Sequence, residues 1–133
     1  MIVDSSALVA ILKRESGWEL YAKALDSAPR SFISASTYVE ISIVADQWKN
    51  PTLSRRVDEL IEEFQVVIEP FSPEQARIAR EAYRNFGKGS GHAASLNFGD
   101  CFSYALARVK REPILFKGED FIHTDLQSAM ATR

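Results

Sequence analysis

The sequence has little cysteine and no long hydrophobic run, and each shortage excludes a class of protein. Its one cysteine, Cys101, cannot form a disulfide within the chain, so a disulfide scaffold is excluded and a cytoplasmic location is expected. Apolar runs such as Ala7–Leu12 are far shorter than the roughly 20 residues that span a bilayer. Met1 leads into apolar residues with no basic stretch before them, so we expect neither a signal peptide nor a membrane partner.

The chain also lacks an excess of positive charge. Its 16 Lys and Arg residues stand against 18 Asp and Glu residues, for a formal net charge of −2. Because Lys and Arg supply most non-specific affinity for nucleic acid, a nucleic-acid role here would require a local site or bound cations. The 133 residues, 46% hydrophobic and 26% charged, are typical of one globular domain, in which we expect residues 127–133 to form a flexible tail.

Segments typical of strands and helices alternate along the chain, and no repeat or linker divides it. Short strands are expected at Met1–Asp4, Ser31–Ser34, Val66–Glu69 and Ile114–Phe116. Apolar residues at helical spacing predict helices over Ser5–Lys13, Trp18–Leu25, Ala35–Trp48, Leu53–Phe64, Ser72–Phe86 and Phe98–Lys110. This alternation predicts an α/β fold whose mainly parallel sheet is covered by helices on both faces.

Four acidic residues are candidates for a functional site. Asp4 follows the first strand, Asp100 lies where a helix begins and Asp120 follows the last strand, and ligands of α/β sheets bind beyond the carboxyl ends of strands. Glu40 lies in an apolar helical segment with no basic residue three or four positions away, where a carboxylate is rarely buried without a partner. Asp4 and Asp100 could instead cap helices, and Asp120 could be an ordinary turn residue.

Together these carboxylates indicate a metal site. Parallel strands could bring all four to one edge of the sheet, where they would raise one another's pKa unless cations compensate. Mg²⁺ and Mn²⁺ prefer such oxygen ligands, whereas the chain has no His/Cys cluster with the spacing of a zinc site. Phosphoryl transfer uses one or two such ions to activate a water, as in a metal-dependent nuclease.

The residues around these acids resemble the PIN-domain toxins of the VapC family. Successive acids are separated by 36, 60 and 20 residues, and the matching segments are Ile2–Leu8, Ile33–Glu40, Leu96–Ala107 and Leu115–Asp125. The resemblance implies a single PIN domain with a central parallel sheet of about five strands. It further implies a Mg²⁺- or Mn²⁺-dependent endoribonuclease, the toxin of a toxin–antitoxin pair, with RNA as substrate and a VapB-type antitoxin as partner. Such toxins commonly form homodimers, for which the apolar stripes of residues 35–48 and 53–64 are a possible interface.

The resemblance also implies roles for the four acids. Asp4 and Asp100 would be direct metal ligands, and Glu40 would complete the shell or orient the attacking water. Asp120 would bind a second ion or act through water.

Other residues near these acids have supporting roles or none. Ser5, where the family usually has threonine, or Ser6 would supply a hydroxyl that steadies the site. Asp125 could be an outer helper, although a structural role is favoured for it. The family's usual Arg-His-Pro after Gly87-Lys88-Gly89 is replaced by Ser90-Gly91-His92-Ala93, which leaves His92 a candidate for phosphate or base contact.

Two other classes of protein remain open at this point. A haloacid-dehalogenase-like phosphohydrolase or a phospho-receiver also uses an Asp after a strand, but the former requires an Asp where this chain has Ser6. A receiver requires its Asp on a later strand, where this chain has Glu69. A non-catalytic binding module, in which the acids are only caps, predicts no metal binding and no loss of activity when they are changed.

Overall fold

A four-stranded parallel sheet forms the centre of the molecule. The structure is a computed structural model that describes residues 1–130. Its strands are β1 (Ile2–Val3), β2 (Phe32–Ser34), β3 (Val67–Glu69) and β4 (Ile114–Leu115). They pair in parallel in the order β3-β2-β1-β4.

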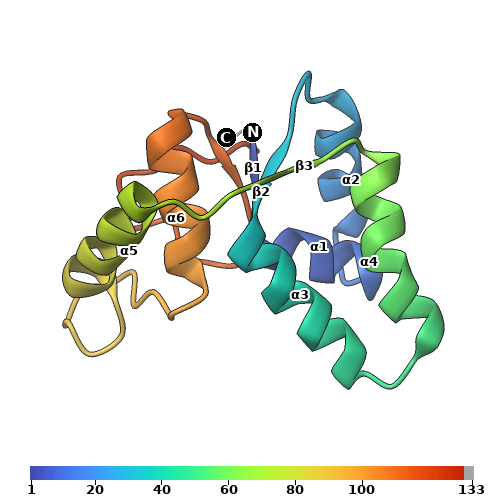
Figure 1. The fold of residues 1–133 in the computed structure, drawn as a ribbon, viewed down its shortest axis with the longest axis horizontal. Coiled ribbons are helices and arrows are strands. Elements are labelled where there is room, and N and C mark those ends of the chain that lie inside the picture. The colour runs from blue at the N-terminus through green and yellow to red at the C-terminus, as the bar shows by residue number, and fades with distance from the viewer. Residues whose placement is uncertain (131–133) are drawn as a thin grey trace.

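Six helices cover the two sides of this sheet, as the alternating pattern predicted. They are α1 (Ser5–Leu12), α2 (Trp18–Ser27), α3 (Ala35–Gln47), α4 (Pro51–Glu63), α5 (Pro73–Phe86) and α6 (Asp100–Lys110). Figure 1 shows α5 and α6 together on one side and α1 to α4 on the other. Each group encloses its own hydrophobic cluster against the sheet. None of the helices described within residues 1–130 is long and apolar enough to cross a bilayer.

Local sequence signals set the helix starts. Ser72 caps α5 by accepting a hydrogen bond from the Gln75 amide at 3.1 Å, and Pro73 takes the first helical position, as predicted. Helix α4 begins at Pro51, two residues before the predicted start, because Asn50 accepts hydrogen bonds from the amides of Thr52 and Leu53.

The sheet has four strands rather than the expected five, and the C-terminal segment explains the difference. Ile114 donates its amide hydrogen to the Gln127 carbonyl at 3.0 Å and accepts one from the Ala129 amide at 2.8 Å. Residues 127–129 therefore lie along the free edge of β4 but form a single bridge, too short for a fifth strand.

The same segment changes the expectation for the tail. Ala129 and Met130 pack against the hydrophobic cluster of α1 to α4, so these residues of the expected flexible tail are part of the folded domain. Residues 131–133 of that expected tail lie outside the described residues.

Candidate active site

Asp4 is the buried centre of the site. It follows β1 and caps α1: its Oδ2 accepts hydrogen bonds from the Ser6 amide at 3.0 Å and from the Ser6 hydroxyl at 2.7 Å. The Ser103 hydroxyl on α6 donates to Oδ1 at 2.6 Å. Burial raises the pKa of this carboxyl, and the hydrogen bonds from Ser103 and Ser6 only partly offset the effect.

Asp100 opens α6 beside Asp4. Its Oδ2 accepts from the Asn97 amide at 3.0 Å, while its own amide donates to the Asn97 side-chain oxygen at 2.8 Å. This reciprocal pair is the capping arrangement that the three-residue spacing predicted. Burial and the nearby charges of Asp4 and Asp120 raise the pKa of Asp100 to about 8, although the bond from Asn97 acts in the opposite direction.

Glu40 reaches the same place from α3. Burial, and then the charge of Asp4, raise its pKa, while the Ser5 hydroxyl partly lowers it. Its carboxylate lies directly against Gly99: a Cβ atom added to that glycine would be 1.9 Å from Oε2 of Glu40. A glycine immediately before Asp100 therefore leaves the space that brings the two acids together.

Asp120 joins the group through Asp100. It lies exposed in the turn after β4, close enough for its carboxyl to raise the pKa of Asp100. Asp4 is thus coupled to Glu40 and to Asp100, and Asp120 to Asp100. Asp4 also caps α1, and Asp100 forms the reciprocal pair with Asn97 at the start of α6, so these local roles of the two acids are confirmed.

Ser6 ties the turn after β4 to this group. Its hydroxyl accepts a hydrogen bond from the Lys117 amide at 3.0 Å while donating to Asp4. The Lys117 ammonium forms an ion pair with Glu15 at 3.0 Å, so its charge is directed away from the acids. Within residues 1–130, no ion pair includes any of the four acids.

Sequence reasoning missed three residues that shape the site: Gly99, Ser103 and Thr37. The hydroxyls of Thr37 and Ser103 are buried and lie 3.4 Å apart. Ser103 follows Asp100 by three residues and Thr37 precedes Glu40 by three, so each shares a helix face with an acid. That spacing was the available signal.

Asp125 has partners of its own. It accepts a hydrogen bond from the Tyr104 hydroxyl at 2.7 Å and pairs with Arg108, both on α6. These contacts fasten the segment after β4 to the side of α6.

Two further candidates also have local contacts. The Nδ1 atom of His92 accepts from the Ala94 amide at 3.0 Å, and its ring packs edge-on against Phe86. Burial, with a smaller effect of the Asp100 charge, raises the pKa of Cys101 to about 11, so its thiol stays protonated at neutral pH.

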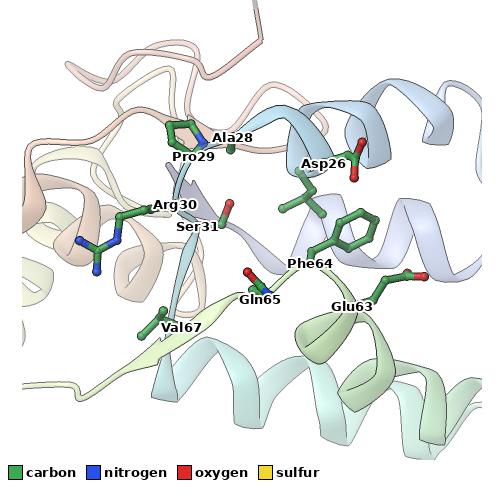
Figure 2. A pocket seen from close by; sticks show the side chains of 10 residues that line it. Asp26, Ala28, Pro29, Arg30, Ser31, Glu63, Phe64, Gln65 and Val67 are labelled. Atoms are coloured by element: carbon green, nitrogen blue, oxygen red, sulfur yellow. The ribbon is translucent and has the colours of Figure 1, made fainter.

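A cavity of about 440 Å³ lies at the amino ends of β2 and β3, away from the carboxyl ends of the strands. Figure 2 shows Ser31 just before β2 together with Arg30, Gln65 and Phe64 around this cavity. None of its lining residues belongs to the four acids. Because ligands of parallel sheets bind at the carboxyl ends of strands, the acids mark the candidate site and this cavity does not.

The acidic group fits a hard divalent cation by its donor chemistry. Within residues 1–130, no three His, Cys, Asp or Glu side chains stand together as a complete metal site. However, three of the four carboxyls have a raised pKa, and no basic side chain in the described part of the chain pairs with the group, so its negative charge can be compensated only by protons or by a bound cation. Oxygen donors of this kind suit Mg²⁺ or Mn²⁺.

Comparison with known proteins agrees with this fold. Residues 1–126 match the family model described as PIN domain. Ribonuclease VapC28 of Mycobacterium tuberculosis is 54% identical over 133 residues, covering 100% of each chain. Ribonuclease VapC42 of the same species is 48% identical over 129 residues, covering 97% of this chain and 98% of the relative.

Solved structures share the fold at lower identity. The crystal structure of Mycobacterium tuberculosis VapC20, a sarcin-ricin loop cleaving toxin, superposes with a TM-score of 0.76 at 16% identity and covers 94% of this chain and 95% of that one. A toxin–antitoxin complex from Klebsiella pneumoniae gives a TM-score of 0.69 at 18% identity, covering 93% and 92%. The full-length relatives and the family model together show that the chain belongs to the PIN-domain family and, within it, to the VapC ribonucleases.

Proposed function

We propose that this chain is a Mg²⁺- or Mn²⁺-dependent endoribonuclease toxin whose reaction centre consists of Asp4, Glu40, Asp100 and Asp120. The observation that carries the proposal is the cluster of interacting carboxyls around a buried Asp4, to which no cationic side chain of residues 1–130 is paired. Membership of the VapC ribonucleases supports it and disfavours a phosphohydrolase or a receiver.

Each acid has a role that follows from its surroundings. Asp4 and Asp100 would hold the cation, because their backbones are fixed at helix starts and their carboxyls are buried. When bound, the cation would compensate negative charge and favour ionisation of the attacking water. Glu40, half-buried with a raised pKa, orients that water and is suited to accept its proton. Asp120, in the exposed turn, would hold a second ion or act through water.

Substitution of the two central acids tests the proposal. Asp4→Asn and Asp100→Asn keep the shape and one oxygen acceptor, so the fold should remain while RNA cleavage is abolished. Asp26→Asn, an exposed residue beside the cavity in Figure 2, is the matched control and should cleave normally. Sequencing the 5′ ends of RNA fragments from cells expressing each variant gives the readout. Normal cleavage by Asp100→Asn with all metal chelated would contradict the mechanism.

RNA binding by a chain of net charge −2 requires local cations, and α5 offers them. Arg77, Arg80 and Arg84 are exposed on one face of this helix, and no ion pair among the described residues includes them. Changing all three to Gln should reduce the slope of log affinity against log salt by about 2, since each single-strand phosphate contact contributes about 0.7. Arg55→Gln on α4 is the control, and an unchanged slope would remove α5 from the RNA-binding surface.

An antitoxin is the second partner that we propose. The toxin–antitoxin complex among the structural neighbours supports an antitoxin as partner, and the protein that we propose is of the VapB type and covers this site. A basic side chain of the antitoxin would take the place of the cation among the four carboxylates. The chain purified in complex with its antitoxin should therefore not cleave RNA, and excess Mg²⁺ should restore part of the cleavage.

A homodimer is the proposed assembly. Val39 and Ile43 on α3 are 53% and 52% exposed, one and three residues from Glu40. The apolar residues of α4 instead pack into the cluster with α1, so α3 is the better candidate for an interface. Val39→Asp combined with Ile43→Asp should convert a dimer to a monomer in sedimentation; an unchanged mass would exclude this face.

A further inference from the structure

Phe98 has unusual exposure for its position beside the acids. It is 74% exposed, more than any other large hydrophobic residue in the described part of the chain. It lies two residues before Asp100 and directly precedes Gly99, against which the Glu40 carboxylate rests. An apolar ring is therefore presented to solvent at the edge of a cluster of carboxylates.

The ring is supported from behind by other aromatic residues. Phe98 packs edge-on against Phe102 with ring centroids 4.9 Å apart, and Phe102 packs edge-on against Phe71 at 5.1 Å. Phe71 comes from the segment between β3 and α5, so the three rings join two separate parts of the chain. The contact with Phe102 supports the ring on one side and leaves most of its surface free.

The backbone of Phe98 is also fixed relative to Asp100. The reciprocal hydrogen bonds between Asn97 and Asp100 close a short turn around Phe98 and Gly99. Two Cα–Cα steps of about 3.8 Å place the Cα atom of Phe98 within about 8 Å of that of Asp100. A group held on the ring is thus held at a set position relative to the reacting carboxylates.

We propose that Phe98 is a positioning residue that stacks against an unpaired base of the RNA substrate, next to the phosphodiester that the acids cleave. This inference rests on the ribonuclease function proposed above. The acids of the site and a net charge of −2 offer RNA no attraction, whereas stacking on an aromatic ring needs no charge and adds affinity beside them. Because only an unpaired base exposes its face, the ring selects single-stranded segments over duplex and tolerates different bases.

Equilibrium binding without cleavage tests this subsite. The full-length protein, with metal chelated, is titrated into a short labelled unstructured RNA, and fluorescence anisotropy gives Kd. Phe98→Ala should weaken binding by about 5-fold to 150-fold, the cost measured for losing one stacked base, and Phe98→Trp should restore it. The control Leu20→Ala removes a side chain on α2 that is 58% exposed and should leave Kd unchanged.

A second set of probes distinguishes stacking from a merely structural effect. Each probe lacks the base at one position. When the missing base is the one that the ring contacts, wild type and Phe98→Ala should bind the probe with the same Kd. Duplex RNA should show no difference between them. The proposal would be overturned if Phe98→Ala left Kd unchanged, or if it weakened binding equally on every abasic probe. It would also be overturned if Phe98→Ala converted a dimer to a monomer in sedimentation, because the ring would then be a contact between subunits.

The result is independent of the reaction itself. Binding that depends on Phe98, in a wild-type protein that fails to cleave with Mg²⁺ or Mn²⁺, would leave this subsite standing and refute the proposed ribonuclease function. Cleavage without any dependence on Phe98 would do the reverse.

Discussion

Asp100→Asn should stabilise the metal-free protein while abolishing its activity. Burial and the neighbouring charges of Asp4 and Asp120 raise the pKa of Asp100 to about 8, against an ordinary 3.8. Between these two pH values the folded chain holds a proton that the unfolded chain releases. The free energy of unfolding of the wild type therefore falls as pH rises from about 4 to about 8.

The pKa difference sets the size of this effect. At about 1.4 kcal/mol per pKa unit, it corresponds to a ceiling of about 6 kcal/mol at pH 8. Solvent screens this partly accessible group, and the neighbouring Asp4 also has a raised pKa and shares the proton, so the ceiling is not reached. We expect Asp100→Asn to gain about 2–3 kcal/mol at pH 8 and almost nothing at pH 4. The asparagine oxygen can still accept the hydrogen bond from the Asn97 amide, so the helix start is kept.

Urea unfolding followed by circular dichroism at several pH values, with chelator present, measures the difference. The variant should show a shallower decline of stability with pH than the wild type, and Asp26→Asn should follow the wild type. Added Mg²⁺ should stabilise the wild type at pH 8 by mass action and have little effect on the variant. An Asp100→Asn protein that is no more stable than the wild type at pH 8 would show that burial and the neighbouring charges do not raise the pKa of Asp100, which would refute the reasoning.

Three other substitutions separate the chemistry from its scaffold. Gly99→Ala should displace the Glu40 carboxylate and reduce cleavage by about 100-fold. The melting temperature should change little, because the backbone at Gly99 is already helical (φ −63°, ψ −37°). Normal cleavage would show that this contact does not hold Glu40 in place. Ser103→Ala removes the donor to Oδ1 of Asp4 and should cost about 1–3 kcal/mol in urea unfolding, a loss that would be absent if water replaced the hydroxyl. Asp125→Asn should cost at most about 1 kcal/mol and leave the cleavage rate intact, and a large loss of cleavage would instead assign Asp125 to the reaction.

Much of the fold followed from local signals that the structure confirms. The Ser72-Pro73 start of α5 and the Asn97–Asp100 pair are short-range hydrogen-bonding patterns, and these can be predicted from a single sequence. The helix/strand alternation likewise predicted a parallel sheet with helices on both faces. The path of residues 127–129 along β4 could not be predicted, because it depends on contacts with an edge distant in sequence.

The candidate site was predictable in part for the same reason. The four acids follow strand ends or lie within a motif, so their positions along the chain carried the signal. Ser103 shares a helix face with Asp100, a signal visible in the sequence, but its bond to Asp4 and the contact of Gly99 with Glu40 could not be predicted, since both exist only after α6 has packed beside β1 and α3. The exposure of Phe98 likewise depends on the tertiary structure, because a phenylalanine at this position of the sequence could equally well be buried in the core.

Asp4 both caps a helix and belongs to the proposed reaction centre, and this affects what inactivating mutations do to the protein. With Asp4 in its proposed role, mutation to alanine would abolish activity, remove a helix cap at about 1 kcal/mol and leave buried donors without an acceptor, so the inactive product would also be less stable and more readily degraded. Mutation of the exposed Asp120 leaves the scaffold untouched. In a cell that also carries an intact copy of the gene, the folded but inactive Asp120 variant would compete for the antitoxin and so free the active toxin. Mutations of Asp4 and Asp120 that both abolish cleavage would therefore have opposite effects on growth.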